Sequence, residues 1–131
     1  MDLINEDYLY AEETYKIIGI LFEVHKTLGK GFSEVVYKDA LEFEFREQNI
    51  LFEREKEYSV NYKNTLLKHK FYADFVVFDA IILEIKTVDC FSNNHYNQCI
   101  NYLKVSKNEL ALLINFNATS LEYKRIVCSK K

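Results

Sequence analysis

Two short stretches of the chain are apolar at almost every position, and they limit the folds that the chain can adopt. Residues 80–83 contain no polar side chain before Glu84, and residues 110–116 are interrupted only by Asn115. Both stretches are far shorter than the ~20 residues that cross a bilayer. Because a strand that is apolar on both sides must be covered on both faces, the sequence predicts interior strands in a sheet that helices flank.

Helical periodicity is present before these strands. Apolar residues recur at helical spacing over about residues 7–28, and Gly29 follows as a C-terminal stop. A second helix is expected to begin after Ser33, which can cap it, and to end near Asn49. The buried stripe of this second helix is expected to consist of Val36, Ala40 and Phe43.

The middle of the chain has the pattern of a strand meander. Apolar and charged residues alternate over residues 52–62, and Asn64 marks a tight turn into a returning strand over residues 66–78. Asp79 then sits at a short turn into residues 80–88. Three consecutive antiparallel strands are therefore predicted.

The last part of the chain is expected to form one helix and two strands. Asn93 or Asn94 can cap a helix that ends around Ser106, and strands follow at residues 110–116 and 121–128. The element order is then ααβββαββ. This order predicts a layered α/β or mixed α+β fold with a central mixed sheet flanked by helices.

Length and composition fit one folded domain. The 131 residues are 49% hydrophobic and 28% charged, without a Pro- or Gly-rich linker, so a single domain is expected over residues 1–131, with its core at about residues 31–128. The net charge is −3, with −6 over residues 1–50 and +3 over the rest. An acidic total argues mildly against nonspecific nucleic-acid binding but leaves room for a local basic cleft.

The N-terminus and the cysteines predict a cytoplasmic protein without a membrane partner. The first seven residues include three acidic side chains, whereas a secretory signal needs a basic start followed by an apolar run. The three cysteines are odd in number and lack CxxC spacing, which fits reduced thiols better than disulfides or a zinc site.

Glu84 and Lys86 place two charges at the end of a strand that should be interior. Burial of unpaired charge is costly, and side chains two apart on a strand project from the same face, roughly 6 to 7 Å apart. Asp74 lies likewise inside an apolar stretch, residues 71–78, and the tight turn at Asp79 would lay its strand beside that of Glu84. Two carboxylates and a lysine would then form one site. The alternative is a cross-strand ion pair between Glu84 and Lys86 without function.

Paired carboxylates of this kind suit Mg²⁺ or Mn²⁺, which keep several waters and also bind substrate phosphate. Such an ion lowers the pKa of bound water and offsets charge on a phosphoryl group, while Lys86 orients or deprotonates that water. The implied chemistry is phosphodiester hydrolysis.

A further motif precedes this constellation. Residues 31–37 read G-x-x-E-x-x-Y and are followed by Asp74 and Glu84-Ile85-Lys86. In this order and spacing, from about residue 17 to residue 127, the chain resembles the GxxExxY family of the PD-(D/E)XK nuclease-like superfamily. One departure is that Ala73, not proline, precedes Asp74. The resemblance implies a restriction-endonuclease-like core.

The resemblance also implies roles for individual residues. Asp74 and Glu84 would be metal ligands, with the backbone carbonyl of Ile85 as a further ligand. Lys86 would be the catalytic lysine. Glu34 would point toward the metal from the first core helix, as a direct ligand or through water.

Other residues would support the site or contact substrate. Gln98 matches a glutamine that supports the site or touches the substrate backbone, and Tyr102 lies one turn beyond it. Tyr37 and Lys38 lie one turn beyond Glu34 and would contact substrate. In the alternative reading, Glu34 merely pairs with Lys38 at i+4, and Gln98 and Tyr102 are surface and rim residues.

The sequence therefore predicts a Mg²⁺- or Mn²⁺-dependent nuclease that acts on DNA, with RNA as the second choice. The alternative is a nuclease-fold module that binds nucleic acid or regulates, with little or no turnover. A homodimer is also expected, because nucleases of this architecture commonly pair to cut both strands.

Overall fold

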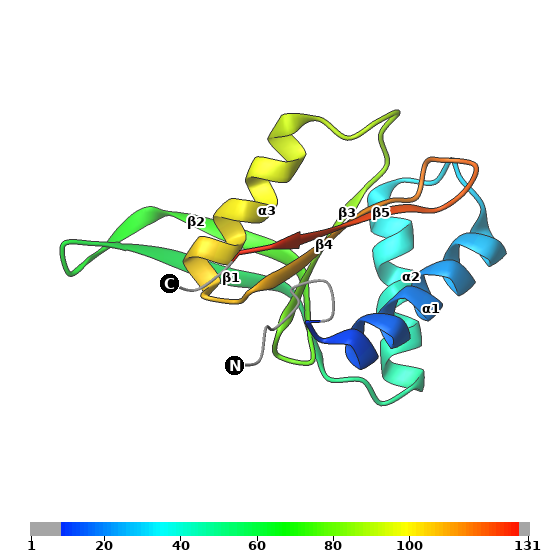
Figure 1. The fold of residues 1–131 in the computed structure, drawn as a ribbon, viewed down its shortest axis with the longest axis horizontal. Coiled ribbons are helices and arrows are strands. Elements are labelled where there is room, and N and C mark those ends of the chain that lie inside the picture. Colours follow the sequence, from blue (N-terminus) through cyan, green and yellow to red (C-terminus); the bar gives the residue numbers. More distant parts are fainter. Residues whose placement is uncertain (1–8, 129–131) are drawn as a thin grey trace, which may run out of the picture.

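The computed structural model describes residues 9–128, which form three helices and five strands in the predicted order ααβββαββ (Figure 1). The elements are α1 (Ala11–Leu28), α2 (Glu34–Glu47), β1 (Phe52–Tyr62), β2 (Thr65–Val77), β3 (Ile81–Lys86), α3 (Asn93–Ser106), β4 (Leu110–Asn115) and β5 (Glu122–Val127). The first two positions of the helix predicted over residues 7–28 lie outside the described residues. The prediction of a mixed α+β fold is confirmed.

The five strands form one mixed sheet in the order β1-β2-β3-β4-β5. The first three strands are antiparallel neighbours, as the predicted meander requires. β3 and β4 run parallel, and α3 is the crossover helix that joins them. β5 returns antiparallel to β4 along the far edge of the sheet.

Apolar side chains pack against both faces of the central strands. Ile81, Leu83 and Ile85 of β3 join the cluster formed with α1 and α2, whereas Ile82 joins the cluster formed with α3. Alternate residues of β4 divide between the same two clusters. The sheet therefore lies between a layer of α1 and α2 and a layer of α3, and the expectation of two-sided burial is confirmed (Figure 1).

The buried stripe of α2 differs from the predicted one. Tyr37, Leu41 and Phe45 are fully buried, whereas Phe43 is 61% exposed. Both stripes have helical spacing, but turning two aromatic rings and a leucine inward removes more apolar surface from water than a valine, an alanine and one ring would. The assignment of Phe43 to the core was wrong for this reason, whereas Ala40 is partly buried and packs against the edge of the core.

The N-cap of α3 lies one or two residues earlier than the predicted Asn93 or Asn94. Ser92 is the N-cap, and Asn93 and Asn94 are already helical. His95 completes the cap, because its Nδ1 accepts a hydrogen bond from the Ser92 N–H at 3.0 Å. None of the helices within residues 9–128 has the length and hydropathy needed to cross a membrane.

The stripe on α2 gives a direct test of the packing. We expect Phe45→Ala to lower the free energy of unfolding by about 3 to 5 kcal/mol, because it leaves a cavity in the core. Phe43→Ala, the matched control on the same helix, should change it by no more than about 0.5 kcal/mol. Urea unfolding monitored by circular dichroism measures both, and equal losses would contradict the orientation of α2.

Candidate active site

The site lies at a fork where β2 and β3 separate. These strands pair only at Phe75↔Leu83, Val76↔Ile82 and Val77↔Ile81. The next opposed positions are Asp74 and Glu84, where the ladder has ended. Beyond the fork β2 stays paired with β1, while β3 stays paired with β4. Backbone N–H groups at the fork therefore need acceptors other than a neighbouring strand.

The two carboxylates supply those acceptors for each other's strand. Glu84 Oε2 accepts a hydrogen bond from the Asp74 N–H at 2.9 Å. Asp74 Oδ2 accepts one from the Ile85 N–H at 2.7 Å. The side chains thus replace the missing ladder bonds, and the backbone fixes where each carboxylate lies.

Glu84 is held in an environment that disfavours its charge. It is 2% exposed, and the pKa of its carboxyl is raised to about 8. Burial is the largest cause of this rise and the Asp74 carboxylate the next, while the Asp74 N–H and the ammonium groups of Lys86 and Lys38 act to lower the pKa. Two carboxylates this close repel each other, and a cation between them would relieve that repulsion.

Lys86 reaches the fork from the α3 side of the sheet. Its Nζ donates a hydrogen bond to Gln98 Oε1 at 2.8 Å. Gln98 is held in turn by the Tyr102 hydroxyl, which accepts from its Nε2 at 3.4 Å and donates to the Tyr72 carbonyl at 2.9 Å. The structure therefore brings Gln98 to Lys86. The alternative ion pair between Glu84 and Lys86 is not among the ion pairs of residues 9–128.

Lys38 reaches the fork from the opposite side, on α2. Its Nζ donates to Asp74 Oδ1 at 3.0 Å and also contacts the Glu55 carboxylate. Burial lowers the pKa of Lys38, but its hydrogen bonds to Glu55 and Asp74 outweigh that effect and raise it. Lys38 is thus a counter-cation of the fork. The i+4 pair with Glu34 is not formed in the described part of the chain.

Glu55 was not predicted as a site residue. Its neighbours Arg54 and Lys56 pair with Phe75 and Ala73, so Glu55 lies opposite Asp74 in the register of β1 and β2. Its φ of 54° is left-handed, which costs an ordinary residue about 1 to 3 kcal/mol. The alternation of apolar and charged residues in β1 predicted only that Glu55 faces solvent. No pattern in the sequence indicated its left-handed conformation or its contact with Lys38.

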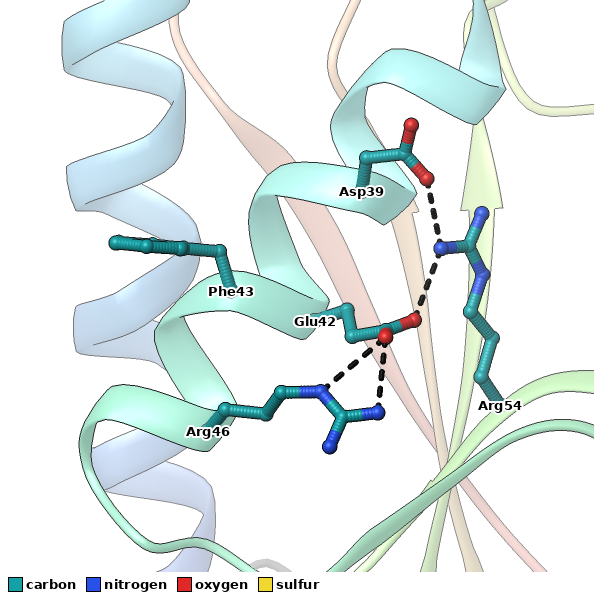
Figure 2. A pocket seen from close by; sticks show the side chains of 5 residues that line it. All are labelled: Asp39, Glu42, Phe43, Arg46 and Arg54. Carbon is teal, nitrogen blue, oxygen red and sulfur yellow. Dashed lines mark hydrogen bonds and ion pairs between the residues drawn. The ribbon is translucent and has the colours of Figure 1, made fainter.

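A second charged cluster anchors β1 just before Glu55 (Figure 2). Arg54 donates to Asp39 at 2.7 Å and to Glu42 at 3.1 Å, and Arg46 donates to the second oxygen of Glu42 at 3.0 Å. Phe43 points away from these ion pairs (Figure 2). The two arginines and two acids neutralise one another, so this pocket serves to fasten α2 to β1.

Two tyrosines that were expected to contact substrate are buried instead. Tyr37 is fully buried, its ring stacks on Phe116 at 4.4 Å, and its hydroxyl donates to the Gly29 carbonyl. Tyr102 is 5% exposed and supports Gln98. Neither presents a surface to substrate. Glu34 is the first residue of α2, and within residues 9–128 no three acidic, histidine or cysteine side chains converge as metal ligands.

Asn115 supports the site, a role that was not predicted from the sequence. It is fully buried on β4 and pairs with Lys86 in the register of the sheet. Its amide accepts from the Val88 N–H at 3.1 Å and donates to the Val88 carbonyl at 2.8 Å. It thereby fixes the chain directly after Lys86. Its position as the one polar residue of the apolar run over residues 110–116 could have indicated this role.

Residues 11–126 match the model of a family described as the PD-(D/E)XK nuclease superfamily. Three chains of solved structures match as well, among them the crystal structure of SSO0001, at 23% sequence identity and a TM-score of 0.57. That match covers 70% of this chain and 48% of the other, so this chain spans about half the length of that structure, and the likeness shows the fold alone. The comparison with curated proteins gave no match.

The raised pKa of Glu84 predicts how stability depends on pH. The folded state binds the proton more tightly than the unfolded chain, whose carboxyl has a pKa near 4.5. The contribution to stability is therefore complete below pH 4.5 and is lost as the pH rises to about 8, by at most about 1.4 kcal/mol per pH unit. In EDTA, Glu84→Gln should flatten this decline in the free energy of unfolding.

Glu23→Gln, at an exposed position on α1, is the matched control for the loss of one acidic group. Urea titrations between pH 4.5 and pH 8.5 compare the three proteins. A decline that Glu84→Gln leaves as steep as in wild type would show that Glu84 ionises normally.

Proposed function

Because the chain belongs to the PD-(D/E)XK nuclease superfamily, we propose that it is a Mg²⁺- or Mn²⁺-dependent nuclease whose active site is the fork between β2 and β3. One observation carries the proposal. The carboxylates of Asp74 and Glu84 are fixed by each other's strand at the fork, with the Lys86 ammonium held by Gln98 on the same strand end. Two acids and a lysine meet where the sheet opens.

The donor set fits a hard divalent cation. Asp74 and Glu84 offer carboxylate oxygens. The pKa of Glu84 is raised by burial and then by the Asp74 carboxylate, and a cation would relieve that repulsion. Ile85 directs its N–H toward Asp74, and a strand residue turns its N–H and its carbonyl toward the same neighbour, so the Ile85 carbonyl would be a further ligand. Mg²⁺ usually binds one or two carboxylates and completes its coordination shell with water and substrate phosphate. Because Asp74 and Glu84 already supply two carboxylates, Glu34 would contact the ion through a bound water.

Two lysines would orient the attacking water and contact the substrate phosphate. When bound, the ion would lower the pKa of a water and offset charge on the phosphoryl group. Lys86 would orient the attacking water, because Gln98 holds its ammonium and Tyr102 holds Gln98. Lys38 would offer its charge to a substrate phosphate from the α2 side.

We also propose that the chain belongs to the GxxExxY subfamily and acts as a single cytoplasmic domain. The motif is one physical unit here: Gly31 has a φ of 109°, and the Tyr37 hydroxyl bonds both Gly29 and the Phe32 N–H. The tyrosine therefore clamps the turn that places Glu34 at the start of α2. DNA is the first substrate to test and RNA the second.

A second candidate function is a nucleic-acid-binding module with little turnover. The observation that favours it is the contact between Lys38 Nζ and Asp74 Oδ1, because that lysine occupies an oxygen that a metal ion would use. In this reading Lys38 neutralises Asp74 permanently, and the site binds phosphate without cutting.

Lys86 separates chemistry from binding. Lys86→Met keeps both carboxylates but removes the group that orients water, so the cleavage rate in Mg²⁺ or Mn²⁺ should fall about 10²- to 10⁴-fold. Binding of DNA in Ca²⁺ should weaken only modestly. Gel assays on single- and double-stranded DNA and RNA measure cleavage, and Lys104→Met on the exposed side of α3 is the control. Equal cleavage by wild type and Lys86→Met would remove Lys86 from the mechanism.

Metal binding has a readout that does not depend on turnover. Mg²⁺ or Mn²⁺ at 100 times its Kd should stabilise the wild-type protein by about 2.7 kcal/mol through mass action. Asp74→Asn should abolish most of that gain, whereas Asp79→Asn, at an exposed turn residue, should keep it. Thermal unfolding with and without metal gives both values, and equal gains in all three proteins would indicate nonspecific ion effects.

A further inference from the structure

The distal part of the β1–β2 hairpin is basic. Residues 58–73, called the arm below, contain Lys63, Lys68 and Lys70 and no acidic residue. The arm therefore has a net charge of +3 in a chain of −3, which leaves −6 for all other residues. A basic segment in an acidic protein is a local electrostatic feature that the net charge hides.

The arm projects beyond the rest of the sheet (Figure 1). β2 pairs with β3 only from Phe75 onward, so the arm consists of β1 and β2 alone. Its tip is a two-residue turn in which Lys63 and Asn64 have φ values of 49° and 64°. Such a turn matches the twist of the two strands, which makes the hairpin a defined element.

Helix α3 covers only the base of the arm. Tyr58 and Phe71 pack into the cluster beneath α3, where the Phe71 ring meets Tyr102 at 5.8 Å. Every residue from 61 to 70 is exposed. Lys63 lies over the Tyr62 ring, and Lys68 makes no ion pair among residues 9–128. Lys70 is partly neutralised by Glu57, which lies just outside the arm.

The exposed surface combines positive charge with rings and apolar side chains. Tyr62 is 56% exposed, Tyr72 48% and Leu66 64%. Lysines neutralise phosphates, and flat rings stack on unpaired bases, so this combination is typical of surfaces that follow a nucleic-acid strand. A basic surface could also bind an anionic membrane or a second copy of the chain, and the experiment distinguishes these partners from nucleic acid.

The arm begins at the proposed active site. Asp74 is the next residue of β2 after the arm, and at a rise of about 3.3 Å per residue Lys70 lies roughly 13 Å from it along the strand. Two extra residues of β2 form a bulge between Lys70 and Leu66, so β1 sets the length of the arm: from Glu55, opposite Asp74, to Tyr62 it spans roughly 23 Å. A duplex with its scissile bond at the fork would lie along the arm for about two thirds of a turn, since one turn is about 34 Å.

We propose that the arm binds the sugar-phosphate backbone of the nucleic-acid substrate on one side of the scissile bond. This inference rests on the proposed nuclease function, whose site lies at the base of the arm. Lys63 and Lys68 are the principal phosphate contacts, and Lys70 joins them when substrate competes with Glu57. Tyr62 is the ring available for stacking where the substrate is single-stranded.

A matched pair of triple variants tests the arm. Lys63, Lys68 and Lys70 are replaced by Gln in one protein, and Lys16, Lys26 and Lys124, exposed on α1 and β5, are replaced by Gln in the other. Both changes remove three positive charges. Fluorescence anisotropy with a labelled 20-base-pair DNA and its single strand, in EDTA and across a salt series, measures binding without cleavage.

The arm variant should lose at least tenfold in affinity at low salt. The slope of log K against log salt should fall by about 2 to 3, because each lost duplex phosphate contact removes about 0.9. The control variant should bind as wild type does. Equal weakening in both variants, wild-type binding by the arm variant, or no binding of DNA or RNA by the wild type would each overturn the proposal.

Failure of the arm and failure of the nuclease proposal give different results. Arm-dependent binding by a wild-type protein that never cuts with any divalent metal contradicts the nuclease proposal and leaves the arm in place. If the arm variant cleaves and binds DNA as wild type does, the proposed role of the arm is contradicted and the nuclease proposal stands. A change in the oligomeric state of the arm variant by light scattering, or arm-dependent binding to anionic vesicles without binding to DNA, would assign the arm to another partner and overturn the proposal.

Discussion

The reciprocal hydrogen bonds between Asp74 of β2 and residues Glu84 and Ile85 of β3 set the geometry on which the rest of the site depends. Where β2 and β3 part, each strand would expose a backbone N–H to the interior, and the carboxylates of Asp74 and Glu84 accept those hydrogen bonds. The groups that terminate the ladder are thus the groups proposed to hold the metal. Their positions follow from the sheet and not from a flexible loop.

The two helical layers complete this arrangement from opposite sides. Lys38 on α2 contacts Asp74, and Gln98 on α3 contacts Lys86. Because each helix also buries an apolar face against the sheet, core packing and site geometry are coupled: a shift of either helix would move a charged group at the fork. Burial of Glu84 carries a cost in free energy that its raised pKa records, and a bound cation would offset that cost.

Much of the fold and the centre of the site could be predicted from the sequence, because they depend on local patterns. Charges within apolar strands indicated Asp74, Glu84 and Lys86, and periodicity gave the order of elements. The stripe on α2 was misassigned because two sets of residues share helical spacing, and only packing selects between them. Glu55 was missed because its left-handed conformation and its contact with Lys38 arise from pairing between segments far apart in sequence.

The most direct test of the central claim is a crystal structure of the protein grown with Mn²⁺, with the ion located by its anomalous scattering. We expect a single strong peak at the fork, about 2.0 to 2.3 Å from carboxylate oxygens of both Asp74 and Glu84, with the Lys38 ammonium displaced from Asp74. No peak at the fork at saturating Mn²⁺, with Lys38 still bound to Asp74, would contradict the claim that these carboxylates form a metal site.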